Sequence, residues 1–278
     1  MQLRNRGFGN GGCATIKTWI MKKIAFFDID GTLVSFEKHS IPESAREAID
    51  TLHRNGVEIV IATGRGATDT PYISGLPYSA VIGLNGSECV LRDGSVAWRH
   101  QIPQELFEKS LELGRKYDFA IAAKTDEGFV IDRLTPRVRE MSATIGEWMP
   151  PVRDLTTLYP GHPVGQLCFF IDPETEKEVM PQLPGLAASR WCDIFADINL
   201  SGIDKGTAIQ EYAAYRGVDL ADVIALGDGE NDLPMLRKAG TGVAMGTASE
   251  LVRSQADYVT GTVDADGIAN ALRHFRLI

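Results

Sequence analysis

The chain has 278 residues, of which 44% are hydrophobic and 23% charged, as is ordinary for a globular protein. Its formal net charge of -9 makes the surface repel phosphodiester backbones, so nucleic acid is excluded as a main partner. No apolar run approaches the roughly 18 residues that a membrane span needs, so no membrane partner is expected. The four cysteines are scattered without zinc-like spacing, which predicts reduced thiols and a cytoplasmic location.

The first 20 residues differ in composition from the rest of the chain. They contain Arg4, Arg6 and a glycine-rich stretch at 7–12, without the apolar segment of a secretory signal. Met21 is followed by two lysines and the first apolar run. We therefore expect residues 1–20 to be a disordered tail and Met21 to be the natural start.

After this tail, short apolar runs alternate with amphipathic segments. The runs at 24–27, 57–62 and 79–84 predict strands, and a helix pattern that begins at Glu43 ends at Gly56. Strands that are apolar on both faces and separated by helices indicate a parallel sheet covered on each side. The predicted fold class is therefore α/β, with a Rossmann-like parallel sheet as the core.

The middle of the chain mixes hairpins with helices. Residues 88–100 predict a β-hairpin around Asp93-Gly94, and residues 103–117 follow as a helix. Further strands are expected at 119–125, 129–134, 164–172 and 189–200, with a helix at 174–183. Because this pattern is typical of an α+β unit, we predict that residues 87–195 form an inserted cap domain. The core is then made of residues 21–86 and 196–278.

The first pattern returns after the insertion. Asp204 is the expected N-cap of a helix that ends at Gly217, and residues 223–226 are an apolar strand. A short helix at 233–239, strands at 243–245 and 258–260 and a last helix at 268–275 follow. Thr247 and Glu250 have the spacing of a capping box, which predicts another helix start.

Four polar segments lie at the ends of these predicted elements, at 28–32, 63–65, 205–206 and 227–232. Each segment alone is explained by an ordinary turn or helix cap. Their joint occurrence is not, because ligands of an open parallel sheet bind where the strands end. The carboxylates expected to converge there are those of Asp28, Asp30, Asp228 and Asp232. Such a cluster needs a cation, and ligation by oxygen alone suits Mg²⁺.

These residue types supply a complete set of groups for phosphoryl transfer. A carboxylate beside a metal ion stays deprotonated and can attack phosphorus. A second carboxylate two residues along the chain can protonate the leaving oxygen and then activate water. Lys205, Thr63 and loop amides can stabilise the charge on the phosphoryl group.

The order of the four segments resembles the four motifs of the haloacid dehalogenase superfamily, and the long insertion resembles the cap of its Cof-type branch. This resemblance implies that Asp28 is the nucleophile, which forms a phosphoaspartate, and that Asp30 is the acid/base. It implies Mg²⁺ ligation by Asp28, the Asp30 backbone carbonyl and Asp228, with support from Asp232. The implied phosphoryl contacts are Thr63, Gly64, Lys205 and Asn231. Thr247 departs from the family pattern, which has Asn in that turn.

Two residues beside these motifs have open roles. Asn85 ends a predicted strand, where it either forms a turn or contacts substrate. Arg65 either shapes its loop or faces solvent.

The predicted function is hydrolysis of small phosphorylated metabolites, such as sugar phosphates, by a monomer or weak dimer. Two alternatives stay open: a phosphotransferase or phosphomutase with the same Asp28 chemistry, and a sensor that binds Mg²⁺ and phosphate without turnover. The substrate itself is set by cap side chains that the sequence does not place.

Overall fold

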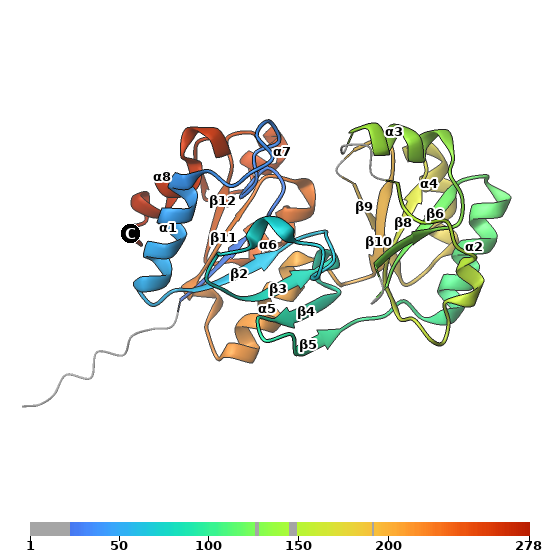
Figure 1. Ribbon diagram of the computed structural model, residues 1–278, viewed down its shortest axis with the longest axis horizontal. Coiled ribbons are helices and arrows are strands. Elements are labelled where there is room, and N and C mark those ends of the chain that lie inside the picture. Colours follow the sequence, from blue (N-terminus) through green and yellow to red (C-terminus); the bar gives the residue numbers. More distant parts are fainter. Residues whose placement is uncertain (1–22, 126–127, 145–148, 191) are drawn as a thin grey trace, which may run out of the picture.

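The computed structural model describes residues 23–125, 128–144, 149–190 and 192–278, which form two sheets covered by helices (Figure 1). The predicted tail at 1–20 lies outside these residues. The strand order is β13-β12-β11-β1-β2-β3-β4-β5 in the larger sheet and β7-β6-β8-β10-β9 in the smaller one. We call the larger sheet with its helices the core, and the smaller sheet with its helices the cap.

The core sheet is parallel except at one edge. Its parallel strands are β1 (Ile24–Phe27), β2 (Glu58–Ala62), β3 (Tyr78–Gly83), β11 (Val223–Gly227), β12 (Thr241–Ala244) and β13 (Tyr258–Val259). The antiparallel edge is the hairpin of β4 (Glu88–Leu91) and β5 (Val96–Arg99). Phe27 of β1 lies opposite both Ile61 and Leu226, so β1 is central and its carboxyl end is flanked by those of β2 and β11.

Helices cover both faces of the core sheet, as the apolar strands require. α1 (Glu43–Arg54) and α8 (Gly267–His274) contribute Ile49 and Leu272 to the hydrophobic cluster on one face. α5 (Lys205–Arg216), α6 (Leu233–Lys238) and α7 (Glu250–Arg253) contribute Tyr212, Leu236 and Val252 to the cluster on the other. This layered arrangement confirms the predicted α/β, Rossmann-like fold class.

The cap is an antiparallel sheet with helices. Its strands are β6 (Ala120–Thr125), β7 (Gly128–Ile131), β8 (Val164–Phe170), β9 (Leu186–Ser189) and β10 (Ala196–Leu200). α2 (Gln104–Lys116) and α4 (Pro173–Val179) cover one face with Phe107 and Val179. α3 (Pro136–Thr144), which the sequence analysis did not predict, places Val138 on an apolar cluster of the other face.

The prediction that residues 87–195 form the cap placed both domain boundaries too early in the chain. The hairpin at 88–99 pairs with β3, and Cys89 is buried in the core cluster, so the hairpin belongs to the core. The segment at 196–200 pairs with β8 and β9 and so belongs to the cap. The chain therefore leaves the core sheet after Arg99 and returns after Leu200. Apolar strands do not reveal in the sequence which sheet they join, because that depends on their pairing partners.

Other local predictions had mixed outcomes. Asp204 is the N-cap of α5, with its side chain accepting from the Thr207 amide, and Gly217 ends that helix at φ 67°, as predicted. The single strand predicted at 189–200 is instead β9 and β10, which pair with each other. α7 is capped by Ser249, so the capping box predicted from Thr247 was wrong.

Among the described residues, no helix is long and apolar enough to cross a bilayer.

Candidate active site

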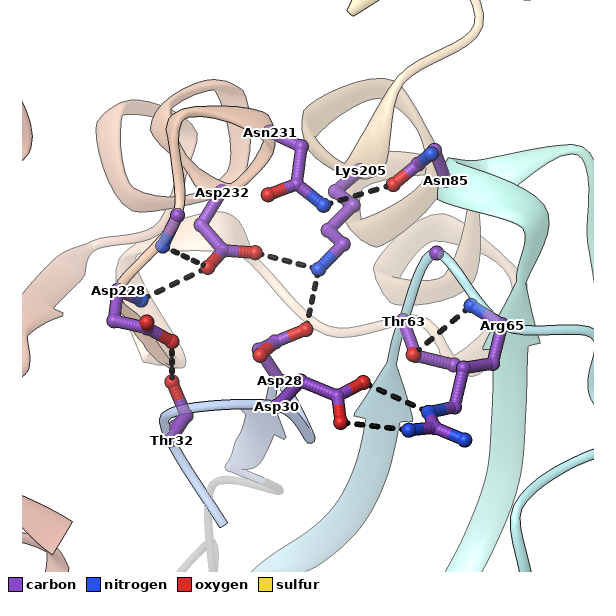
Figure 2. A network of polar contacts seen from close by, with 12 residues as sticks. Asp28, Asp30, Thr32, Thr63, Arg65, Asn85, Lys205, Asp228, Asn231 and Asp232 are labelled. Atoms are coloured by element: carbon purple, nitrogen blue, oxygen red, sulfur yellow. Dashed lines mark hydrogen bonds and ion pairs between the residues drawn. The ribbon is translucent and has the colours of Figure 1, made fainter. Parts of the chain in front are cut away.

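The predicted site residues meet at the carboxyl ends of three adjacent strands (Figure 2). Asp28 follows β1, Thr63 follows β2, and Asp228 follows β11. The backbone continues the sheet here, because the Asp28 amide donates to the Leu226 carbonyl (3.0 Å). The parallel arrangement of the sheet therefore brings together residues that are up to 200 positions apart in the chain.

Three carboxylates form a tight cluster. Asp28, Asp228 and Asp232 each offer an oxygen within 4.8 Å of the others. Oδ2 of Asp232 accepts from the amides of Asp228 and Gly229 (2.9 Å each), which fixes the loop after β11. Thr32 donates from Oγ1 to Oδ1 of Asp228 (2.8 Å), so the carboxylate is held from the other side as well.

Lys205 is the cation of this cluster. It is the first residue of α5 and has no solvent-exposed surface. Its Nζ donates to Oδ1 of Asp28 (2.6 Å) and to Oδ1 of Asp232 (2.5 Å). Burial opposes a charge on Lys205, but the carboxylates of Asp232 and Asp28 outweigh this effect and raise its pKa. The lysine therefore remains an ammonium ion between two carboxylates.

The cluster has more negative charge than Lys205 balances. Burial, followed by repulsion from Asp232, raises the pKa of Asp28 well above its usual range, although Lys205 opposes the shift. Burial and Asp232 also raise the pKa of Asp228 to about 7, against the hydrogen bond from Thr32. With all three carboxyl groups ionised, the cluster and the one ammonium have an excess of two negative charges. A divalent cation with a preference for oxygen ligands fits this donor set.

Gly31 is required by the close approach of two loops. Its φ of +88° lies in the left-handed region, which side chains rarely adopt. An added Cβ would overlap with the Asp228 carboxylate and lie 2.7 Å from the Phe36 ring. The glycine in the first motif thus allows the loops after β1 and β11 to touch.

Asp30 does not join the three-carboxylate cluster with its side chain. Its carboxylate forms a bidentate ion pair with Arg65, through Nε–Oδ2 and Nη2–Oδ1 distances of 2.8 Å each. Arg65 also lies over the Tyr72 ring at 5.4 Å, and its amide donates to Oγ1 of Thr63 (3.1 Å). The structure therefore places Arg65 in the site, whereas the sequence analysis left open only whether it shapes its loop or faces solvent.

Asn231 and Asn85 extend the site toward the cap. Nδ2 of Asn231 donates to Oδ1 of Asn85 (3.0 Å), and Nδ2 of Asn85 donates to Asp197 of the cap (3.1 Å). Gly64 contacts the cap as well, since its carbonyl accepts from Nζ of Lys124 (2.9 Å). Sequence reasoning missed Lys124 and Asp197, because nothing in the pattern of the cap strands marks them as neighbours of the motifs.

Comparison with known proteins identifies the family. A model of the haloacid dehalogenase-like hydrolases matches residues 25–272. The chain belongs to this family. A phosphatase of the haloacid dehalogenase superfamily from Bacteroides thetaiotaomicron is similar in structure, with a TM-score of 0.90 and 46% identity over 96% of this chain and 100% of that one.

Two further proteins that are similar to the present chain are named for their substrates. A subclass IIB sugar phosphatase has a TM-score of 0.85 and 35% identity over 92% of this chain and 100% of that one. The 5-amino-6-(5-phospho-D-ribitylamino)uracil phosphatase of Bacillus subtilis (strain 168) is 28% identical over 92% of this chain and 96% of its own. The present protein is thus a Cof-type member of the superfamily and a phosphoric monoester hydrolase.

Proposed function

We propose that the protein is a Mg²⁺-dependent phosphatase that hydrolyses small phosphorylated metabolites through a phosphoaspartate at Asp28. The observation that carries the proposal is the position of Asp28: its buried carboxylate contacts Lys205 and shares an excess negative charge with Asp228 and Asp232. A nucleophile in this place is kept ionised by cations and lies where a phosphoryl group can be bound by the loops after β1, β2 and β11.

The residues that would hold Mg²⁺ are Asp28 and Asp228, together with the backbone carbonyl of Asp30. Asp232 would support them, since its oxygens accept from Lys205 and from the amides of Asp228 and Gly229. The excess charge of the carboxylate cluster supports this assignment. The ion would supply charge neutralisation and a ligand position for a phosphate oxygen.

The reaction follows from the roles of two carboxylates. One oxygen of Asp28 forms a bond to phosphorus while the bond from phosphorus to the leaving oxygen breaks, and Asp30 delivers a proton to that oxygen. Asp30 then takes a proton from water, whose oxygen attacks phosphorus and releases Asp28. Arg65 contacts both oxygens of Asp30 and would fix the orientation of this carboxyl group.

The remaining motif residues would bind the phosphoryl group. We assign Thr63, the Gly64 amide, Lys205 and Asn231 to its oxygens, where their donors would stabilise developing charge. Asn85 would act through Asn231, because its own carboxamide is engaged by Asn231 and Asp197.

We further propose sugar phosphates or similar esters as substrates, because the relatives include a sugar phosphatase and a phosphatase of a phosphoribityl compound. We propose a cytoplasmic monomer or weak dimer. The free thiols of Cys89, Cys168 and Cys192 support a reducing compartment.

The test is release of inorganic phosphate from a panel of phosphomonoesters, with Mg²⁺ or with a chelator. We expect Mg²⁺-dependent release without any phosphorylated activator, which would exclude an obligatory phosphomutase. Asp28→Asn should lower kcat by at least about 10⁴-fold, because it removes the nucleophile. Full activity of this variant would eliminate the covalent mechanism, and an inactive wild-type protein that still binds phosphate would favour the sensor alternative.

A further inference from the structure

The polar end of one cap face lies against the active site. Lys124 of β6 is paired with Gln166 of β8, and Cys168 of β8 is paired with Asp197 of β10, so these side chains share a face. Asn199 lies on the same face, two residues beyond Asp197. The far end of this face is apolar and covered by α3, whereas the near end is polar and contacts the core.

The two outer members of this polar end bind carbonyl groups of the core. Lys124 donates from Nζ to the Gly64 carbonyl (2.9 Å), directly beside Thr63. Asn199 donates from Nδ2 to the carbonyl of Leu84 (2.9 Å) and to Oγ of Ser87 (2.8 Å). Both side chains therefore have partners on the turns that carry the active-site residues.

Gln166, on the strand between them, has a donor without an acceptor. Its side chain is fully buried, and its Oε1 accepts from Nζ of Lys124 (3.4 Å). Its Nε2 has no hydrogen-bond partner among the residues that the structure describes. Buried amide groups are nearly always hydrogen-bonded, because an unmatched donor is destabilising. The amide of Gln166 therefore indicates a missing acceptor at the junction of cap and core.

The charges around this amide are balanced within the cap. Lys124 lies 3.7 Å from Oδ1 of Asp197, and Asp197 accepts in addition from Asn85. A second anionic group on a ligand would gain little here, because the lysine already has a counter-ion. An uncharged oxygen, such as that of a hydroxyl or ether, is the acceptor that fits Nε2 of Gln166.

We propose that Gln166 is a specificity-determining residue whose Nε2 donates to a hydroxyl or ether oxygen of the leaving group when substrate lies between the cap and the core. The preferred substrates are then phosphate esters of neutral polyols rather than of alkyl chains or of groups with a second charge. The inference rests on the proposed function, since it takes the phosphoryl group to lie beside Thr63 and Asn231. Gly64 and Asn85, which lie beside these residues, are hydrogen-bonded to Lys124 and Asp197 of the cap. Lys124 and Asp197 are in turn neighbours of Gln166 on the same face of the cap sheet.

The experiment measures affinity without turnover, by calorimetry on the Asp28→Asn protein with Mg²⁺. The probes are ribitol 5-phosphate and n-pentyl phosphate, which have the same carbon chain and differ in hydroxyl groups, together with inorganic phosphate. We expect ribitol 5-phosphate to bind more tightly than n-pentyl phosphate. Adding Gln166→Met should lower the affinity for ribitol 5-phosphate by about fivefold to tenfold, which corresponds to the loss of one neutral hydrogen bond. The affinities for the other two probes should not change.

Gln166→Glu provides a second variant, because it keeps the size of the side chain and replaces the donor with an acceptor; it should lose the same preference. Gln104→Met is the matched control: this exposed cap glutamine donates to Glu108 of its own helix. Thermal unfolding of each variant verifies the fold. The proposal would be overturned if Gln166→Met lowered the affinity for all three probes equally. It would also be overturned if the protein with Gln166 in place bound ribitol 5-phosphate no more tightly than n-pentyl phosphate.

The same proteins separate this inference from the proposed function. If the wild-type protein releases no phosphate from ribitol 5-phosphate or other esters while the binding preference depends on Gln166, the phosphatase assignment fails and the assignment of Gln166 stands. If phosphate is released and the preference is the same with Met at position 166, only the assignment of Gln166 fails.

Discussion

Lys205 shows how much one buried charge can stabilise at the residue scale. Its Nζ lies between Asp28 and Asp232, in a place without contact to solvent. Removing one partner of such a group leaves uncompensated charge in the interior, which typically costs about 3–5 kcal/mol. The lysine therefore stabilises the fold as well as the chemistry assigned to the site.

We predict that Lys205→Met lowers the free energy of unfolding of the metal-free protein by about 3–5 kcal/mol, measured by urea denaturation. Lys38→Met is the control, since Lys38 pairs with Asp264 at the surface, where solvent screens the attraction and the pair contributes little to stability. Equal effects of the two substitutions would mean that the buried lysine has no special role in stability.

Arg65 is expected to position Asp30. Without its guanidinium, the carboxylate loses both hydrogen bonds that now fix it. We predict that Arg65→Ala lowers kcat by about tenfold to a hundredfold for alkyl phosphates, which need a proton on the leaving oxygen. The loss should be smaller for p-nitrophenyl phosphate, whose leaving group departs without one.

Arg65→Lys, which keeps the charge, should recover part of this activity. The measurement is kcat for leaving groups of graded basicity. A loss that is the same for all leaving groups would assign Arg65 to general stability of the loop.

At the scale of secondary-structure elements, the contact between α5 and α6 places Lys205. Gly206, the second residue of α5, faces Pro234 of α6, and an added Cβ would overlap with the Pro234 carbonyl. Backbone atoms cannot move aside as a flexible side chain can. The helix that carries Lys205 is thus close to α6 because residue 206 lacks a side chain.

We predict that Gly206→Ala destabilises the protein by about 1–3 kcal/mol, although alanine favours helix formation in general. It should also lower activity, because α5 and Lys205 shift away from Asp28. Ala214→Ser, at an exposed position of the same helix, is the control and should change stability by about 0.5 kcal/mol or less. Urea unfolding and kcat are the measurements, and a neutral Gly206→Ala would contradict the packing argument.

The β4–β5 hairpin shows that strand pairing decides which of the two sheets a hairpin joins. The Asp93-Gly94 turn predicts this hairpin correctly, but both the core and the cap contain antiparallel strands. The hairpin joins the core because Ile82 pairs with Cys89 and because Trp98 donates to the Gly86 carbonyl (3.2 Å). Neither contact has a local sequence signal.

At the scale of the whole molecule, the carboxylate cluster couples stability to pH. The pKa of Asp228 is raised to about 7 by burial and by Asp232, whereas an unfolded Asp titrates near about 3.9. Between these values the folded protein retains a proton that the unfolded chain has lost. Stability of the metal-free protein therefore decreases as pH rises through this window.

We predict that, in a chelator, the free energy of unfolding of the wild-type protein falls from about pH 5 to about pH 7.5 more than that of Asp228→Asn. Mg²⁺ should restore stability at the higher pH, because it binds the deprotonated carboxylates. The measurement is urea unfolding at both pH values, with and without Mg²⁺. Parallel pH dependence of the two proteins would show that Asp228 does not titrate in this range.

The sequence by itself determined the parts of this protein that depend on near neighbours. The period of the apolar residues predicted the alternating strands and helices, and the turn chemistry placed the motifs with Asp28, Thr63 and Asp228 at strand ends. Asp204 and Gly217 marked the bounds of α5 through local hydrogen bonding and a left-handed residue. The parallel sheet then required these motifs to converge.

Only the tertiary structure decided which sheet each middle strand joins and which side chains meet across the two sheets. The pair of Asp30 with Arg65 and the unmatched amide of Gln166 arise from residues that are far apart in the sequence. Their energies depend on burial and on partners that no local pattern specifies. The physical reason is that the periodicity of apolar residues shows which face of a helix or strand is buried. Strand pairing and electrostatic contacts between distant residues decide which partner covers that face.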